Sequence, residues 1–167
     1  MSIIDLPSSH GFARSGDPDM IIVHCMGEYI DLYDDPVPDP HAESFLHMIG
    51  LSAHALVCPN GDIISCRDDV EGAYHAKGFN STSLGIEFLV EGTHTIATLA
   101  DTIIGPYLKN DQYDAGLEYV RDWIQEYDIP RERVLRHSDV SPGRKIDPGA
   151  GFPWDAFLNS CYGRRGR

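Results

Sequence analysis

The stretch 52-SAHALVCPNGDIISC-66 contains two apolar runs, 54–58 and 62–66, with a short polar turn between them. Short apolar runs bounded by turn residues are typical of β-strands. The turn is Pro59-Asn60-Gly61-Asp62, and Asn-Gly supplies the positive φ angles that tight hairpin turns require. The sequence therefore predicts an antiparallel hairpin over 54–66.

Three further apolar runs, at 20–25, 84–90 and 133–136, also predict strands. The intervals between them are long enough for crossover connections, which parallel strands need. We therefore expect an α/β fold with a central mixed β-sheet flanked by helices. The 167 residues fit one domain. Its core is expected to span about 20–160.

A helix is predicted from Asp111 to Tyr127, where large apolar residues recur every three or four positions. Asn110 or Asp111 can cap its first turn. Ile129-Pro130 marks its end, because proline cannot continue a helix. A final short helix is expected from Trp154 to Leu158.

Another short helix is predicted at 40–49. Asp39 can cap it, and Pro40 falls in the first turn, where the missing N–H leaves no hydrogen bond unmade. The residues expected to face the core are Phe45, Met48 and Ile49.

The formal charge is −13, from 13 basic and 26 acidic side chains. This balance argues against a nucleic-acid partner, whose binding depends on basic groups that neutralise phosphates. No apolar stretch approaches membrane-spanning length, and the N-terminus lacks the basic start and apolar centre of a secretory signal. We expect the protein to be synthesised in the cytoplasm and not to insert into a membrane. In the cytoplasm the four cysteines would stay free. The oligomeric state is left open.

The segment 136-RHSDVSPGRKIDPGAGFPW-154 carries residues suited to metal chemistry. His137 and Asp147 lie on one proline-containing loop, and histidine and aspartate are both residue types that bind metals. Lys145 lies beside them. His24, at the end of an apolar run, is the candidate for a third ligand. Zinc in hydrolases is typically held by three protein groups, with the fourth position open to water. The alternative is that these are ordinary histidines, since the chain has eight.

Three blocks of the chain resemble the zinc-dependent N-acetylmuramoyl-L-alanine amidases of type 2, a family that includes phage lysozyme-type amidases and relatives of the peptidoglycan recognition proteins. They are IIVHCM at 21–26, residues 52–88 ending in SLGIEF, and RHSDVSPGRKIDPG at 136–149. The resemblance implies hydrolysis of the amide bond between N-acetylmuramic acid and L-alanine in peptidoglycan or muropeptides. It also implies one Zn²⁺ per chain.

Carried over residue by residue, the resemblance implies zinc ligation by His24, His137 and Asp147. It assigns the general-base role to Glu87 and places Lys145 near the scissile carbonyl. Relatives that only bind peptidoglycan have typically lost the third ligand, and this chain keeps Asp147. We therefore expect an enzyme, with a non-catalytic peptidoglycan-binding module as the alternative.

Chemical arguments support two of these roles. Glu87 lies in the apolar run 84–90, where burying an unpaired charge is costly, although a glutamate pointing to water at a strand edge is the alternative. Ala53 stands where some relatives have tyrosine and cannot transfer a proton, which leaves that work to Glu87. Lys145 can stabilise a developing oxyanion, although alone it would be a solvated lysine like Arg144.

The loop around His75 is the expected substrate contact. His75 matches a family histidine near the mouth of the site, and Asn80 and Lys77 could contact glycan or peptide; a loop histidine bonded to nearby backbone is the alternative for His75. His54 is expected to be a core group or to support a ligand, because a fourth protein ligand would close the zinc to water. No functional role is predicted for the remaining histidines, His10, His41, His47 and His94.

Two further questions bear on function. A cysteine peptidase built on His24 and Cys25 is disfavoured, because successive strand residues face opposite sides of a sheet. The zinc ligands are expected at strand ends on one side of the sheet. The sequence does not separate a phage endolysin, which would reach the wall through membrane lesions, from an enzyme that recycles muropeptides.

Overall fold

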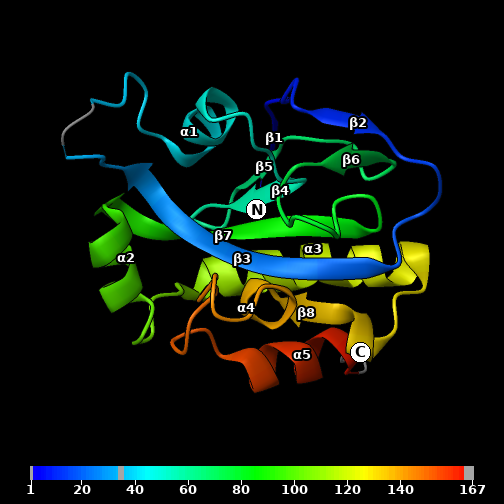
Figure 1. Ribbon diagram of the computed structural model, residues 1–167. Coiled ribbons are helices and arrows are strands. Elements are labelled where there is room, and N and C mark those ends of the chain that lie inside the picture. Colours follow the sequence, from blue (N-terminus) through cyan, green and yellow to red (C-terminus); the bar gives the residue numbers. More distant parts are fainter. Residues whose placement is uncertain (1, 34–35, 164–167) are drawn as a thin grey trace.

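The computed structural model describes residues 2–33 and 36–163 and contains a mixed six-stranded sheet with layers on both faces (Figure 1). The strand order is β1-β5-β4-β7-β3-β8, and only the β4–β5 pair is antiparallel. The strands are β1 (Ile3–Asp5), β3 (Met20–Ile30), β4 (Ala55–Val57), β5 (Ile63–Ser65), β7 (Ser83–His94) and β8 (Val134–Arg136). The predicted α/β fold with a central mixed sheet is confirmed.

A small antiparallel ribbon, β2 (Gly11–Ala13) with β6 (Glu71–Ala73), lies with α1 over one face of the sheet (Figure 1). Helices α3 and α5 cover the other face. The helices are α1 (Ala42–Met48), α2 (Ile96–Thr102), α3 (Asn110–Tyr127), α4 (His137–Val140) and α5 (Trp154–Tyr162), with a 3₁₀ turn at Arg131–Arg133. Within the described residues, no helix combines the length and apolar character needed to cross a membrane.

Each of the five predicted strands is present. Strand β3 extends past its predicted end to Ile30, and β7 extends to His94. Strands β1, β2 and β6 were not predicted from the sequence. Each has three residues, too few to show an alternating pattern, so their pairing depends on neighbours distant in the chain.

The hairpin between β4 and β5 forms as predicted, but its turn chemistry differs. Gly61 has a positive φ of 84°, whereas Asn60 does not. The N–H of Gly61 donates to the carbonyl of Cys58, and the N–H of Cys58 donates to that of Asp62. The Asn-Gly prediction of two positive φ angles is therefore wrong: one glycine in the left-handed region closes the loop.

The prediction for the short helix needs correction. Helix α1 begins at Ala42 and is capped by His41, whose ring nitrogen accepts from the N–H of Glu43. Asp39 is therefore not the cap, and Met48 and Ile49 are about half exposed. In this seven-residue helix the buried positions are Ala42 and Leu46, one turn apart on one stripe.

The long helix α3 begins one residue before its predicted start, at Asn110, so the cap is Lys109 rather than Asn110 or Asp111. Asp128 ends the helix in the left-handed conformation. Helix α5 continues to Tyr162, four residues beyond the predicted Leu158.

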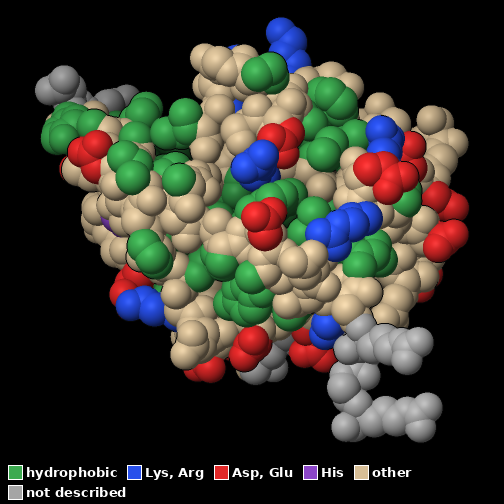
Figure 2. Space-filling model, turned by 90° about the horizontal axis from the view of Figure 1, so that it is seen from below, with side chains coloured by type: hydrophobic (Ala, Val, Ile, Leu, Met, Phe, Trp, Pro, Cys, Tyr) green, Lys and Arg blue, Asp and Glu red, His purple; other side chains and the backbone are tan. Residues whose placement is uncertain are grey.

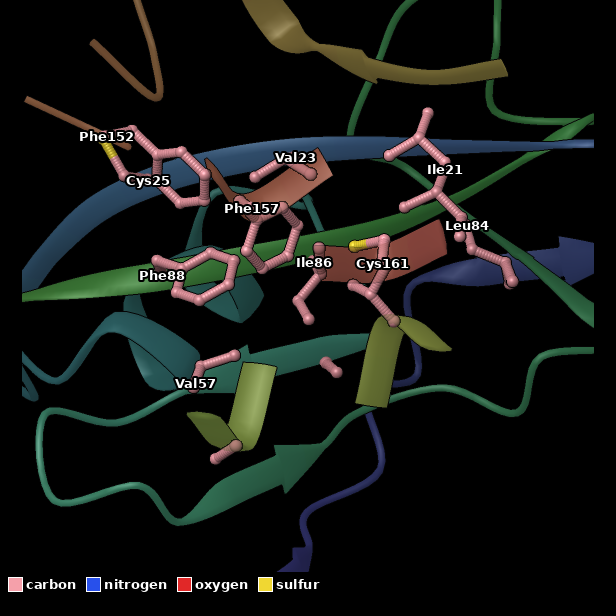
Figure 3. Close-up of a cluster of buried hydrophobic side chains, with 14 of the residues drawn as sticks. Ile21, Val23, Cys25, Val57, Leu84, Ile86, Phe88, Phe152, Phe157 and Cys161 are labelled. Atoms are coloured by element: carbon pink, nitrogen blue, oxygen red, sulfur yellow. The ribbon is translucent and has the colours of Figure 1, made fainter. Parts of the chain in front are cut away.

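The two central strands separate a core face from a polar face. Alternate residues, including Val23 of β3 and Ile86 of β7, join the aromatic and aliphatic cluster beneath α3 and α5 (Figure 3). Cys25 belongs to this core face, as predicted. The intervening positions place His24 and Glu87 side by side on the opposite face, as partners in the parallel register.

Gly116, in the middle of α3, allows the helix to approach the sheet closely. A Cβ added there would lie 2.4 Å from ring atoms of Phe88, which is fully buried. We predict that Gly116→Ala lowers the free energy of unfolding by about 1–3 kcal/mol, because overpacking outweighs the better helix propensity of alanine. Urea denaturation measures the change. Gly105→Ala, with open space at its Cβ, is the control, and a Gly116→Ala protein as stable as wild type would contradict the prediction.

Candidate metal centre

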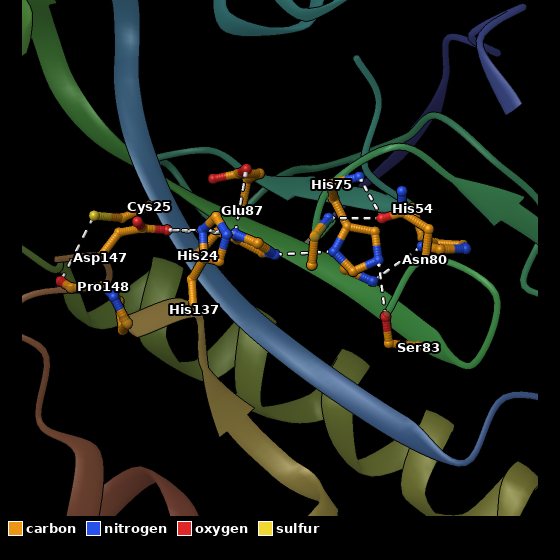
Figure 4. A network of polar contacts seen from close by, with 12 residues as sticks. His24, Cys25, His54, His75, Asn80, Ser83, Glu87, His137, Asp147 and Pro148 are labelled. Atoms are coloured by element: carbon orange, nitrogen blue, oxygen red, sulfur yellow. Dashed lines mark hydrogen bonds and ion pairs between the residues drawn. The ribbon is translucent and has the colours of Figure 1, made fainter. Parts of the chain in front are cut away.

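Three elements bring His24, His137 and Asp147 together on the polar face (Figure 4). His24 lies in β3, His137 begins α4 directly after β8, and Asp147 follows on the loop after α4. The His24 and His137 Nδ1 atoms are 2.8 Å apart, and Asp147 Oδ2 lies 2.9 Å from that of His137 and 3.3 Å from that of His24. The structure thus brings together the three residues that the sequence singled out.

This geometry suits one small cation. Ligands held about 2.0–2.2 Å from a tetrahedral zinc lie roughly 3.3 Å from one another. The three donor atoms are separated by 2.8–3.3 Å, so they face one point at a slightly shorter spacing. The other nitrogen of His137, Nε2, is buried and has no hydrogen-bond partner among the described residues. All side-chain hydrogen bonds of His137 therefore pass through the nitrogen that faces the cluster.

A chain of hydrogen bonds behind His24 determines which of its nitrogens carries a proton. The Ser83 hydroxyl donates its one hydrogen to the Phe79 carbonyl at 2.8 Å. Toward His75 Nε2, 3.2 Å away, the hydroxyl can therefore only accept, so His75 Nε2 carries the proton. His75 Nδ1 is then unprotonated and accepts from His24 Nε2 at 3.0 Å. Because a neutral His24 carries its proton on Nε2, its Nδ1 has a free lone pair, which faces His137 and Asp147.

Burial and charge support these protonation states. Burial lowers the pKa of His24 and lowers that of His75 well below its usual value, so both rings are neutral. Burial opposes ionisation of Asp147, but its contacts with His137 and His24 together lower its pKa, so it is a carboxylate. The imidazoles of His24 and His137 and the carboxylate of Asp147 are ligand types that zinc binds.

Glu87 lies beside this cluster with one oxygen unpaired. Its Oε1 is 3.9 Å from His24 Nδ1, and its buried Oε2 has no hydrogen-bond partner among the described residues. Burial raises the pKa of Glu87 well above its usual value, and the nearby Asp147 carboxylate raises it further. The side chain is 10% exposed, so the alternative of a solvated glutamate at a strand edge is wrong.

Lys145 and Arg144 reach the site from the loop that carries Asp147. Lys145 is exposed and makes no side-chain hydrogen bond or ion pair with any described residue. Its charge acts on Glu87, whose pKa it lowers against the stronger effect of burial. Arg144 donates to the hydroxyl of Ser141 at 2.7 Å. Lys145 is thus a free cation at the edge of the cluster.

The loop around His75 borders the site, and His75 itself lines the cavity beside the cluster. His75 also lies behind His24, to which it is hydrogen-bonded. Its ring packs against Gly85, and a Cβ added to Gly85 would lie 2.5 Å from that ring. The Asn80 side-chain oxygen accepts from the N–H groups of His75 and Ala76, at 3.1 and 2.7 Å, and so braces this loop. Lys77 is exposed.

His54 is a core group. Its Nδ1 accepts from the N–H of Gly85 at 2.9 Å, so in the neutral ring Nε2 carries the proton and donates to the Glu71 carbonyl at 3.0 Å. It contributes no atom to the cluster of His24, His137 and Asp147.

Cys25 does not face the histidines. It packs on the opposite face of the sheet, and burial raises the pKa of its thiol well above the usual value. All four cysteines are free. A cysteine nucleophile activated by His24 therefore has no geometric support.

A cavity of about 550 Å³ opens over the cluster. Its floor includes His24, Glu87 and Asp147. Its lining is largely apolar and includes Phe45 and Ile49 from the α1 region and Ile96 and Leu99 from α2. The cations Arg144 and Lys145 also line it.

The sequence analysis did not identify Ser83 and Gly85. The signal was present in β7, where Ser83, Gly85 and Glu87 alternate with Leu84, Ile86 and Phe88. Small or polar residues at every second position of a buried strand indicate a face that packs against something other than the core.

Comparison with known proteins gives a consistent result. Residues 14–150 match the family described as N-acetylmuramoyl-L-alanine amidase. The chain is 30% identical to the 1,6-anhydro-N-acetylmuramyl-L-alanine amidase AmpD of Escherichia coli K12, over 91% of this chain and 88% of that protein. It is 37% identical to N-acetylmuramoyl-L-alanine amidase AmiD of the same organism, over 53% of this chain and 31% of AmiD.

Solved structures agree. A crystal structure of AmpD superposes with a TM-score of 0.72 at 26% identity, covering 95% of this chain and 94% of that one. AmiD from E. coli in complex with anhydro-N-acetylmuramic acid-L-Ala-D-γ-Glu-L-Lys superposes with a TM-score of 0.64 at 25% identity, covering 89% and 60%. The endolysin of Thermus scotoductus phage Ph2119 shares the fold, with a TM-score of 0.67 at 17% identity over 95% and 98%.

We predict that His54 makes stability depend on pH. Burial lowers its pKa to about 3, whereas in the unfolded chain the value is about 6.5. The unfolded state alone therefore gains this proton between pH 6.5 and 3, so stability is full above pH 6.5 and is lost as the pH falls. From pH 7 to pH 5 the free energy of unfolding should fall by about 2 kcal/mol more in the wild type than in His54→Gln. Urea titrations at both pH values measure this, and parallel losses in the two proteins would contradict it.

Proposed function

Because this chain belongs to the N-acetylmuramoyl-L-alanine amidase family, we propose that it hydrolyses the amide between the lactyl group of N-acetylmuramic acid and L-alanine with one zinc ion held by His24, His137 and Asp147. The observation that carries this proposal is the cluster of these three donors beside the unpaired oxygen of Glu87. When bound, zinc supplies a Lewis acid that polarises the scissile carbonyl and makes water nucleophilic near neutral pH.

Glu87 is proposed as the general base and then the general acid. It takes the proton from the attacking water and delivers it to the leaving nitrogen of L-alanine. A carboxylate is most effective here when its pKa approaches the working pH, and burial shifts Glu87 in that direction. Glu87 pairs with His24 in the parallel register, which supports a role beside the proposed metal ligands.

Lys145 is proposed to stabilise the negative charge that develops on the carbonyl oxygen. It is a cation without a partner among the described residues, on the loop that carries Asp147. A positive charge that is already in place costs no reorganisation when the charge develops.

The proposed substrates are soluble muropeptides, including those that end in anhydromuramic acid. The relatives matched over 86–88% of their length, at 28–30% identity, are named for the 1,6-anhydro sugar, whereas the endolysins share 17–21% identity and support the fold alone. This favours a recycling enzyme over an endolysin. We further propose that residues 1–167 form one amidase domain, made in the cytoplasm.

Substitutions should separate metal binding from proton transfer. We predict that Glu87→Gln keeps one zinc per chain but loses about 10²- to 10⁴-fold in kcat, because the shape of the site is retained and only proton transfer is lost. Asp147→Ala should lose both zinc and activity, because only two of the three proposed zinc ligands, the imidazoles of His24 and His137, remain. Zinc content by atomic emission, with release of stem peptide by mass spectrometry, measures both effects.

The outcomes exclude different parts of the proposal. Normal turnover by the Glu87→Gln protein would remove Glu87 from the general-base role. Tight binding of muropeptide by the zinc-loaded wild type, with no product after long incubation, would instead favour the peptidoglycan-binding module.

The choice of substrate can be tested by comparing rates. We predict a higher rate on a soluble anhydromuropeptide than on intact sacculi at equal concentrations of scissile bonds, because the cavity of about 550 Å³ has the size of a small-ligand site. Product peptide is quantified by chromatography in both assays. Faster release from sacculi would indicate an endolysin.

A further inference from the structure

The loop that carries Asp147 passes very close to the chain that follows α2. A Cβ added to Gly149 would lie 2.5 Å from the carbonyl oxygen of Ile103, and Gly149 has a positive φ of 84°. Gly151 donates its N–H to the same oxygen at 2.8 Å, and a Cβ added to Gly151 would overlap the carbonyl of Gly105. Two glycines therefore allow this loop to lie directly against residues 103–105.

A buried carbonyl on this loop, that of Pro148, accepts from two side chains of the core. The hydroxyl of Tyr107 donates to it at 2.9 Å. The thiol of Cys25 also donates to it, at 3.6 Å, but a thiol is a weak donor (Figure 4). Tyr107 is 9% exposed and Cys25 is 5% exposed. The stronger of the two hydrogen bonds, from Tyr107, thus holds the residue that directly follows Asp147.

The carbonyl of Asp147 itself is also fixed. It accepts from the N–H of Ser138 at 3.0 Å, and Ser138 directly follows His137. Two successive carbonyls, of Asp147 and Pro148, are therefore held by groups that are far from each other in the chain. A side chain attached between two fixed peptides has few positions left, so these contacts decide where the Asp147 carboxylate lies.

Charged side chains at the surface do not hold this part of the loop. Within the described residues, no exposed side chain donates a hydrogen bond to 148–151. Acidic and basic side chains lie intermixed on the face shown in Figure 2, so that face has no concentration of one charge that could act on the loop. The position of the loop therefore depends on its buried contacts.

We propose that Tyr107 is a positioning residue for the metal centre: acting through the Pro148 carbonyl, its hydroxyl fixes the Asp147 carboxylate beside His24 and His137. This assignment rests on the proposed function, in which Asp147 is a zinc ligand. Tyr107 lines neither cavity and makes no hydrogen bond to a proposed ligand. Groups that orient metal ligands in this way strengthen metal binding, because the ligands need not be ordered when the ion arrives.

The contact also connects the metal centre to a wall of the cavity. Tyr107 lies shortly after α2, whose Ile96 and Leu99 line that wall. The segment between α2 and Tyr107 carries the Ile103 carbonyl that accepts from Gly151. One set of buried hydrogen bonds thus fixes both the ligand loop and the end of the helix that borders the substrate.

The test compares four proteins. Tyr107→Phe removes one oxygen and keeps the ring. The matched control is Tyr113→Phe, which removes a hydroxyl that donates to Ser160 at 3.5 Å, outside both cavities. Gly116→Ala controls for a general loss of stability, since its overpacking lies on α3. The wild type completes the set, and the Kd for zinc is measured by competition with a chromophoric chelator.

The Kd for zinc should rise about tenfold in Tyr107→Phe, the lower end of the loss that follows removal of a group that orients a ligand. Tyr113→Phe and Gly116→Ala should keep the wild-type Kd, even though Gly116→Ala unfolds at a lower urea concentration. An unchanged Kd in Tyr107→Phe would overturn the assignment. So would an equal rise in Gly116→Ala, because the effect would then reflect stability alone.

A measurement on zinc-free protein separates this proposal from the proposed function. The amides of Ser138 and Gly151 report on the loop, because they donate to the carbonyls of Asp147 and Ile103. By NMR, their hydrogen exchange should be several times faster in Tyr107→Phe than in Tyr113→Phe, with no change at the Cys58 amide in the distant hairpin.

The outcomes of this measurement are distinct. Faster exchange at the two loop amides supports the assignment even if the wild type binds no zinc, a result that would contradict the proposed function alone. Equal exchange rates in the two tyrosine variants would overturn the assignment even in an active zinc enzyme.

Discussion

The parallel pairing of β3 with β7 is the constraint on which the rest of the structure depends. Its register places His24 opposite Glu87 on the polar face, while Val23 and Ile86 pair on the core face. A shift of one residue would turn His24 into the core and expose its apolar neighbours. The aliphatic core beneath α3 and α5 therefore holds the register and, through it, the position of the site.

Burying polar side chains on this sheet face is costly unless each has a partner. His24 and His137 are at most 3% exposed, and with Asp147 they satisfy one another. Ser83 and His75 continue the network behind His24. Two atoms are exceptions, because Glu87 Oε2 and His137 Nε2 are buried without a hydrogen-bond partner among the described residues. An unpaired group in such a network costs stability, and the proposed chemistry uses Glu87.

Sequence reasoning succeeded where local pattern decides structure and failed where short elements depend on distant partners. The long helix and the strands around His24 and Glu87 show clear periodicity and were predicted, although the cap of the helix was misplaced. The edge strand Ile3–Asp5 pairs with residues sixty positions away and has no pattern of its own. In α1, cap and buried face both depend on where a seven-residue helix starts, which propensity does not determine.

The sequence alone determined the residue types, the fold class and the alternation that puts His24 and Cys25 on opposite faces, because these follow from local periodicity and from resemblance. Only the tertiary structure decided that His24 Nδ1 meets His137, 113 positions away, and that Glu87 and Asp147 share one cavity with Arg144 and Lys145. Such contacts depend on strand register and on how loops dock. A small error in strand register or in loop position moves an atom by more than the length of a hydrogen bond. Local sequence pattern therefore cannot determine these contacts.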